Sequence, residues 1–299
     1  MEKSPQKFYE IIINANSTVD QIYTAIFELR TINNKEAVEL LKQGFHHLNK
    51  VENKSCLLLH EIAYALGQAD LGLESLITQF LIQIICDDQQ FDVVRHEAAE
   101  ALANINQKEA LEIFEKYSKK NVNDDLNILQ DTCTIGLEKA KSINDLGHLY
   151  GLKYLGTREP AAPFEHLEKN PVEYILDEQT TLFNKYRALY YLRNNADTYF
   201  DKIDQLLISN KLGALFKHEI CFVIGQVGEA PKQIHEALIN MIKDENQPAI
   251  ARHEAIAAFQ TVSSNKEITL EILNAYAKSP DQIVRETAIV SLKMMEFYG

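Results

Sequence analysis

Four His-Glu dipeptides recur in matching contexts, and their spacing reveals a duplicated repeat. His60-Glu61 and His96-Glu97 lie 36 residues apart, and His218-Glu219 and His253-Glu254 lie 35 residues apart. Corresponding members of the two pairs are offset by 158 and 157 residues. Periods of roughly 20 to 50 residues are typical of solenoids, in which each repeat is one supersecondary unit that stacks on its neighbours. The spacing therefore restricts the chain to a repeat architecture present in two copies.

The apolar residues around each dipeptide predict a helix. Each helical residue advances by about 100°, so positions −2, +2, +5, +6 and +9 relative to the histidine form one stripe. All four copies are apolar there: Leu58, Ile62, Ala65, Leu66 and Ala69; Val94, Ala98, Ala101, Leu102 and Ile105; Phe216, Ile220, Val223, Ile224 and Val227; Ala251, Ala255, Ala258, Phe259 and Val262. The histidine falls opposite the stripe. We expect it to face an inner, concave surface rather than the core.

A fifth dipeptide, His235-Glu236, serves as an internal control. Gln233 and Asn240 occupy two of its stripe positions, so it fails the pattern. We interpret it as a solvated surface pair. For the other four, the alternative left open is a repeat consensus without chemistry.

The chain is predicted to be all-α, because glycine is scarce and β-alternation is hard to find. We expect a superhelix of HEAT-like repeats, an α-α solenoid, with two pseudo-symmetric halves of about four helix pairs each. Segment 57–68 echoes 215–226, and 24–34 echoes 186–196. The His-Glu helix is predicted to be the second helix of each pair.

The domain boundary is predicted from proline. Pro160, Pro163 and Pro171 are three of only seven prolines, and proline interrupts helices. We therefore expect an N-terminal half over 1–156, a linker over 157–171 and a C-terminal half over 172–299.

Composition narrows the classes of molecule that the chain is expected to bind. The net charge is −13 and no basic run exceeds Lys119-Lys120, which argues against nucleic acid as a partner and favours a cationic ligand or a basic protein patch.

The most apolar stretch, 76–86, is too short and too polar to cross a membrane, and no secretory signal is evident. Four widely spaced cysteines, interpreted as reduced packing residues, favour a cytoplasmic location: Cys56, Cys86, Cys133 and Cys221.

The His and Glu side chains indicate a metal site. Two histidines and one carboxylate with open positions form the facial triad of non-haem Fe(II) oxygen chemistry. Each half can supply that set: His60, His96 and Glu97 in one, and His218, His253 and Glu254 in the other. Two Fe(II) would also balance the four dipeptide glutamates in charge. Zinc hydrolysis stays open as an alternative, although the H-E-x-x-H pattern of zinc peptidases is absent.

The motifs themselves resemble a known family. LLLHEIAYALGQ, VRHEAAEALANI, LFKHEICFVIGQ and ARHEAIAAFQTV, with LFNKYRALYYLRNN and a proline-rich link, look like deoxyhypusine hydroxylase over nearly the whole chain. That resemblance implies a HEAT-like di-iron monooxygenase, which uses O2 to hydroxylate the deoxyhypusine side chain of translation initiation factor 5A and so forms hypusine.

The resemblance also assigns roles to residues. It implies two Fe(II) per chain, one held by His60, His96 and Glu97 and the other by His218, His253 and Glu254. Glu61 and Glu219 would then serve catalysis by binding and orienting the cationic substrate side chain. Glu100, about 40° from His96 on the same helix, is a weaker candidate for substrate binding.

The sequence departs from the family at several positions. Ala257 replaces the glutamate that would match Glu100, Phe259 and Gln260 replace the usual Leu and Gly, and Ala103 stands where glycine is common. The link also reads REPAAPF where the family tends toward DPAPP. None of these departures touches an expected iron ligand. They bear on the symmetry of substrate contacts and on the path of the last His-Glu helix.

Two other function classes compete with the hydroxylase. A non-enzymatic HEAT scaffold would bind a basic protein segment, but it has no need of all eight His and Glu positions. A HEAT-like lyase of the bilin-attachment type shares the repeat, but it has no evident need of paired His-Glu sites. The scaffold's His-Glu sites would bind metal structurally or not at all, so a protein that takes up no Fe(II) would favour it, and absence of iron together with pigment affinity would favour the lyase.

Overall fold

The computed structural model describes residues 4–70, 72–105, 109–119, 127–142, 158–228 and 230–298. These residues form helices and connections and contain no strand, as the sequence predicted. The chain divides into two compact units, Met1–Ser142 with Gly156–Pro160, and Ile143–Leu155 with Ala161–Gly299. The predicted boundary at 156/157 lies outside the described residues.

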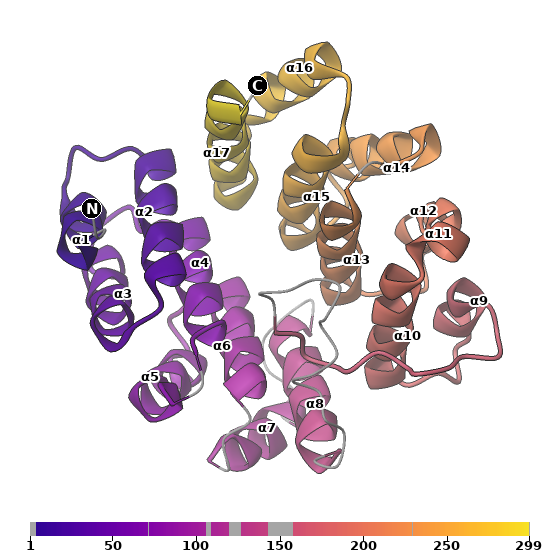
Figure 1. Ribbon diagram of the computed structural model, residues 1–299, viewed down its shortest axis with the longest axis horizontal. Coiled ribbons are helices and arrows are strands. Elements are labelled where there is room, and N and C mark those ends of the chain that lie inside the picture. The colour runs from indigo at the N-terminus through magenta and orange to yellow at the C-terminus, as the bar shows by residue number, and fades with distance from the viewer. Residues whose placement is uncertain are drawn as a thin grey trace. The chain divides into compact units, whose positions relative to one another are not determined.

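The first unit is built from helix pairs that stack in two layers (Figure 1). The second helices of successive pairs, α2, α4, α6 and α8, pack against one another in order, and α3, α5 and α7 cover them on one side. The bounds are α1 Pro5–Ile13, α2 Val19–Ile32, α3 Lys35–Leu48, α4 Cys56–Gly67, α5 Glu74–Cys86, α6 Asp92–Ile105, α7 Ala110–Lys119 and α8 Ile128–Lys141.

The second unit repeats this plan, with α10, α13, α15 and α17 in one layer and α9, α12, α14 and α16 against them. The bounds are α9 Pro171–Leu176, α10 Leu182–Asn194, α11 Ala196–Tyr199, η2 Phe200–Lys202, α12 Asp204–Leu207, α13 Ala214–Val227, α14 Lys232–Lys243, α15 Ala249–Val262, α16 Lys266–Tyr276 and α17 Gln282–Tyr298. In each unit the His-Glu helices are the second members of their pairs, as predicted.

One repeat departs from a regular helix pair. The first helix of the third His-Glu repeat is broken into α11, η2 and α12. Its buried side chains are Phe200, Ile203, Leu206 and Leu207. They lie on the 3₁₀ turn, on the residue that joins it to α12, and on α12 itself. The three short pieces therefore still bury apolar side chains in place of one regular helix.

The predicted apolar stripes form the contact between neighbouring His-Glu helices. All the stripe positions are buried except Val227, which is half-buried near the end of α13. The helices approach most closely where the stripes carry small residues. A Cβ added to Gly67 would lie only 2.7 Å from Ala101 Cα, so α4 and α6 are in near-backbone contact at this point.

Three equivalent turns lead into α6, α10 and α15. Each begins with an aspartate whose Oδ1 accepts the backbone N–H two residues on, at 3.0 Å: Asp87 from Gln89, Asp177 from Gln179, and Asp244 from Asn246. A second backbone bond closes each turn from the fourth residue to the aspartate carbonyl. These Asx turns start each helix at a set distance from the one before it.

The described part of the predicted linker is held to the first unit by side chains from three helices. Asn104 Nδ2 and Gln68 Nε2 donate to the Arg158 carbonyl at 3.2 and 3.3 Å, and Lys139 Nζ donates to the Glu159 carbonyl at 2.7 Å. Farther on, Pro171 is the first residue of α9, a position that tolerates proline. The prolines thus lie outside helix interiors, as expected.

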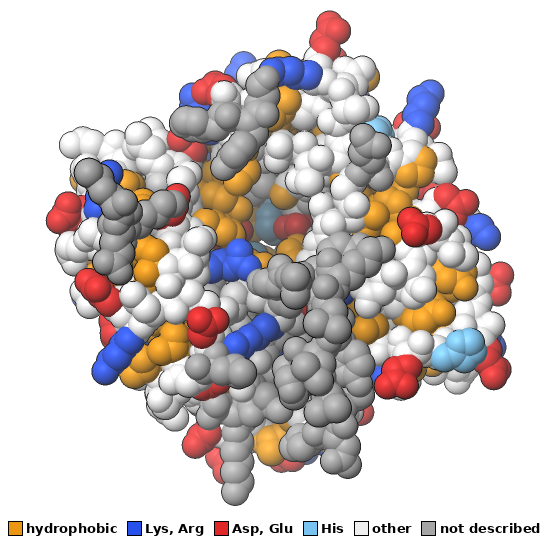
Figure 2. All heavy atoms as spheres, in the orientation of Figure 1, with side chains coloured by type: hydrophobic (Ala, Val, Ile, Leu, Met, Phe, Trp, Pro, Cys, Tyr) orange, Lys and Arg blue, Asp and Glu red, His pale blue; other side chains and the backbone are white. Residues whose placement is uncertain are grey.

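Among the described residues, no helix combines the length and the apolar character that a membrane span requires. Acidic side chains are scattered over the face drawn in Figure 2, among neutral atoms and fewer basic groups. This distribution agrees with the net charge of −13.

Candidate metal centre

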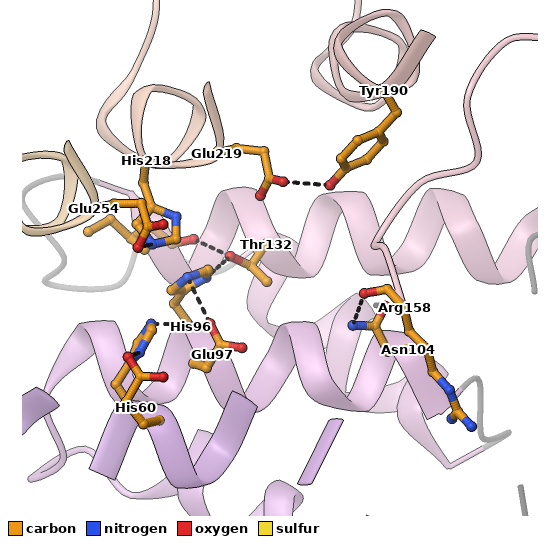
Figure 3. A network of polar contacts seen from close by, with 12 residues as sticks. His60, His96, Glu97, Asn104, Thr132, Arg158, Tyr190, His218, Glu219 and Glu254 are labelled. Atoms are coloured by element: carbon orange, nitrogen blue, oxygen red, sulfur yellow. Dashed lines mark hydrogen bonds and ion pairs between the residues drawn. The ribbon is translucent and has the colours of Figure 1, made fainter. Parts of the chain in front are cut away.

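The first unit brings His60, His96 and Glu97 together (Figure 3). Glu97 Oε2 lies 3.2 Å from His60 Nε2 and 3.6 Å from His96 Nε2, so one carboxylate oxygen faces a nitrogen of each ring. One donor atom from each of the three residues lies within 4.8 Å of the other two, which is close enough to hold a single metal ion. This is the set that the sequence assigned to one site.

The histidines, which the sequence placed opposite the apolar stripes and facing an inner, concave surface, are buried. His60, His96, His218 and His253 are at most 6% exposed. On α4, nearly every side chain around the helix is buried, including Glu61. Because buried imidazole and carboxylate groups need a partner charge, this burial favours a metal role over a solvated one.

Electrostatics at His60 point in the same direction. Burial by itself would lower the pKa of His60, but the carboxylates of Glu97 and Glu61 outweigh it and raise that pKa well above 6.5. A positive charge is thus favoured between these groups. A bound metal cation would supply it in place of the proton.

In the second unit His218, His253 and Glu254 lie near one another, but, among the described residues, one donor atom from each does not come within 4.8 Å of the other two as in the first set. The His218 and His253 rings are 5.4 Å apart at 36°, compared with 6.2 Å and 38° for His60 and His96. His218 Nε2 lies 3.7 Å from Glu254 Oε2. The Glu254 side chain is 16% exposed, whereas that of Glu97 is 5% exposed. The second set is therefore similar in composition and more open.

The two remaining dipeptide glutamates lie in different settings. Glu61 Oε1 lies 3.4 Å from Nδ1 of its neighbour His60, the ring nitrogen that does not face Glu97. Glu219 Oε1 instead accepts a 2.7 Å hydrogen bond from the Tyr190 hydroxyl on α10 (Figure 3). Tyr190 is fully buried, and Arg193, also buried, lies over its ring at 5.0 Å. Tyr190 was not predicted from the sequence, because nothing in the stretch around it marks it as a partner of Glu219.

Glu100 faces a cation of the protein itself. Lys139 on α8 has a pKa lowered to about 8 by burial, and the nearby charge of Glu100 acts against that lowering. Lys139 also donates to Asn104 Oδ1 at 3.1 Å. The structure thus places Glu100 beside the contacts that hold residues 158 and 159, and gives it a structural partner.

A buried arginine directly precedes two of the histidines. Arg95 Nε donates to the Ile85 carbonyl at 3.0 Å, and Arg252 Nε donates to the Ile242 carbonyl at 3.1 Å. Each arginine also pairs at 3.0 Å with an acidic side chain, Asp88 or Asp281. These arginines tie two of the His-Glu helices, α6 and α15, to the end of the helix before each. The shared letters R-H-E were the signal that could have found them.

His235 differs from its interpretation as a solvated surface residue. It is half-buried, its ring lies edge-on to Phe259, and its Nε2 lies 3.1 Å from the Val262 carbonyl. A solvated histidine would not hold that position, so the interpretation was wrong for His235. It was right for Glu236, which is exposed and pairs with Lys232 at 3.3 Å. The reason is that the end of α15 presents an open carbonyl to α14.

Comparisons with known proteins agree with this picture. The family model described as PBS lyase HEAT-like repeat matches residues 94–119. Two curated proteins named deoxyhypusine hydroxylase are similar over nearly the whole chain. The one from Candida albicans is 31% identical over 98% of this chain and 93% of its own, and the one from Danio rerio is 32% identical over 96% and 90%.

A solved structure is similar as well. Human deoxyhypusine hydroxylase in complex with glycerol matches with a TM-score of 0.84 and 28% identity, covering 98% of this chain and 96% of that one. The repeat match alone would suit the lyase alternative, but the full-length similarities are to hydroxylases.

Proposed function

The chain belongs to the deoxyhypusine hydroxylase family, and from that premise we propose that it is a di-iron, O2-dependent monooxygenase that hydroxylates the deoxyhypusine side chain of translation initiation factor 5A to form hypusine. The observation that carries the proposal is the convergence of His60, His96 and Glu97, with a second set of the same composition in the other unit. The proposal includes a cytoplasmic location, where a translation factor acts.

The donor set fits iron. In the proposal, His60, His96 and Glu97 hold one Fe(II), and His218, His253 and Glu254 hold the other. Two imidazoles and one carboxylate are the donor types of non-haem Fe(II) oxygen chemistry. When bound, the iron would activate O2 for hydroxylation of the substrate carbon, one oxygen atom entering the product and the other leaving as water with two electrons from an external reductant. The protein supplies ligand geometry and a buried setting that limits access of water.

The two remaining glutamates are assigned to the substrate. The deoxyhypusine side chain is a long cation, so Glu61 and Glu219, each within its own unit, would pair with amines of such a side chain as carboxylates and orient it. Burial of both residues supports this role, because a charge pair is stronger where water is excluded. Glu100 is the weakest of the assignments, since Lys139 already lies near its charge.

Metal content and turnover test the proposal together. The full-length protein, purified without added metal and then reconstituted with Fe(II), should hold about two irons and hydroxylate deoxyhypusine on the intact substrate protein. His60→Ala and His253→Ala should each lose iron and activity. His47→Ala is the matched control, because His47 is exposed and lies on α3 away from the dipeptides.

Glu61→Ala and Glu219→Ala separate ligands from substrate contacts. Both variants should keep their iron and lose turnover. Loss of iron from both would move these glutamates into the ligand set. Two zinc ions with hydrolytic activity, or a wild-type protein that takes up no Fe(II), would contradict the proposed function.

A further inference from the structure

The second histidine of each pair contacts a threonine from the next inner helix. His96 Nδ1 lies 2.8 Å from Thr132 Oγ1 on α8, and His253 Nδ1 lies 3.4 Å from Thr287 Oγ1 on α17. Both threonines are buried. They follow their histidines by 36 and 34 residues, which is one further step of the repeat. Each unit thus has a threonine where the next His-Glu dipeptide would fall.

The hydrogen bonds of the threonine hydroxyls determine whether histidine or threonine donates the hydrogen between them. Thr132 Oγ1 donates to the Ile128 carbonyl at 2.9 Å, and Thr287 Oγ1 donates to the Ile283 carbonyl at 2.8 Å. A hydroxyl has one proton, and in both cases the helix backbone uses it. The threonine oxygen can then only accept from the histidine, so Nδ1 is the nitrogen that carries hydrogen. In His96 this leaves the lone pair on Nε2, the atom that faces Glu97.

We propose that Thr132 and Thr287 are positioning residues that hold His96 and His253 as metal ligands, by fixing the ring orientation and keeping the Nε2 lone pair available. The inference rests on the proposed function for the identity of the metal. His60 differs, because its Nδ1 faces the carboxylate of Glu61 rather than a hydroxyl. In the first unit, the Nδ1 atoms of the two histidines thus face groups of different charge.

Thr132→Val tests the role, because valine keeps the shape of threonine and removes the hydroxyl. Anaerobic titration of the metal-free, full-length protein with Fe(II) should show affinity at one of the two sites weakened by about 10- to 100-fold, the usual effect of losing such an outer contact. Thr287→Val should weaken the other site by less, since its bond is longer. Thr132→Ser keeps the hydroxyl and should restore most of the affinity.

The matched control is Thr134→Val. Thr134 lies on the same helix and donates to the Gln130 carbonyl at 2.8 Å, but it projects about 200° away from Thr132. It should bind Fe(II) like the wild type. The thermal midpoint of each metal-free variant shows whether folding itself is altered, which a purely structural role of Thr132 would predict.

The outcomes separate failure of the positioning role from failure of the proposed function. A wild-type protein that binds Fe(II) and a Thr132→Val variant that binds it equally well would overturn the positioning role alone. Equal weakening in Thr132→Val and Thr134→Val would do the same, because the effect would then belong to the helix. A wild type that binds no Fe(II) would instead overturn the proposed function.

Discussion

At the scale of single residues, repeated positions in the two units have acquired different partners. Glu61 and Glu219 are equivalent in sequence, yet one lies beside its own histidine and the other accepts from the Tyr190 hydroxyl. A carboxylate held by a 2.7 Å bond from a buried phenol is fixed in place before any ligand arrives. Under the proposed substrate role, Glu219 is therefore the better prepared of the two for orienting an amine.

We expect Tyr190→Phe to raise the KM for the deoxyhypusine-bearing protein by about tenfold, with unchanged iron content. The reason is that a hydrogen bond to a charged group contributes roughly 1.5–3 kcal/mol, and its loss leaves Glu219 free to turn. Steady-state kinetics with parallel iron analysis measures the effect. Tyr191→Phe, the neighbouring and more exposed tyrosine, serves as control. An unchanged KM would show that the phenol does not help Glu219 act.

At the scale of helices, the stripes and the dipeptide positions were predictable, whereas the supporting contacts were not. The spacing of Val94 and Ala98 in the sequence predicts a buried helix face, and both side chains are buried. The contact of His96 with Thr132 depends on how α6 packs against α8, and no periodicity within either helix encodes it. The broken helix around Ile203 was likewise not predicted, since the spacing of its apolar residues Phe200, Ile203, Leu206 and Leu207 also suits an unbroken helix.

The close approach of α4 and α6 predicts opposite results for two equivalent glycines. Gly67→Ala would place a Cβ 2.7 Å from Ala101 Cα and should destabilise the protein by about 1–3 kcal/mol, the usual cost of overpacking. At Gly225 the nearest atom, Ala258 Cα, is 3.5 Å away, so Gly225→Ala should be neutral or stabilise by up to about 1 kcal/mol. Urea denaturation of both variants checks the sign. Equal destabilisation would contradict the difference in spacing.

The contacts that hold residues 158 and 159 make a further prediction. Lys139→Met removes the donor to the Glu159 carbonyl and to Asn104, so an arginine-specific protease should cut after Arg158 several-fold faster than in the wild type. Mass spectrometry of the early fragments measures that cut. Lys141→Met is the control, because exposed Lys141 makes only a surface pair with Glu138. A cut rate that both variants share would rule out the tethering role of Lys139.

At the scale of the whole molecule, a duplication in sequence corresponds to two units that each contain one of the proposed ligand sets. The family, the all-helical class and the pairing of His with Glu could all be anticipated from the sequence. The inequality of the two sets could not, because exposure of Glu254 and the longer Thr287 contact arise from packing around identical ligand types. The same inequality suggests that the two sites hold metal with different strength.

Metal removal should therefore lower stability. A ligand that binds only the folded state adds about 2.7 kcal/mol at a concentration 100 times its Kd, so chelation of iron should lower the thermal midpoint. Calorimetry with and without chelator measures this shift. His60→Ala should show a smaller shift of the thermal midpoint than the wild type, and His47→Ala should show the same shift as the wild type. A wild-type thermal midpoint that is the same with and without chelator would argue that the metal does not stabilise the folded state.

The turns before α6 and α15 also bear on how sequences of this family can change length. Arg95 and Arg252 each reach back ten residues to a carbonyl at the end of the preceding helix, across a five-residue connection that contains an Asx turn. One inserted residue there would lengthen this ten-residue spacing, so the arginine and the carbonyl would no longer meet in the same geometry. Insertions and deletions that accumulate during evolution should consequently collect in other connections, and these two turns should keep their length.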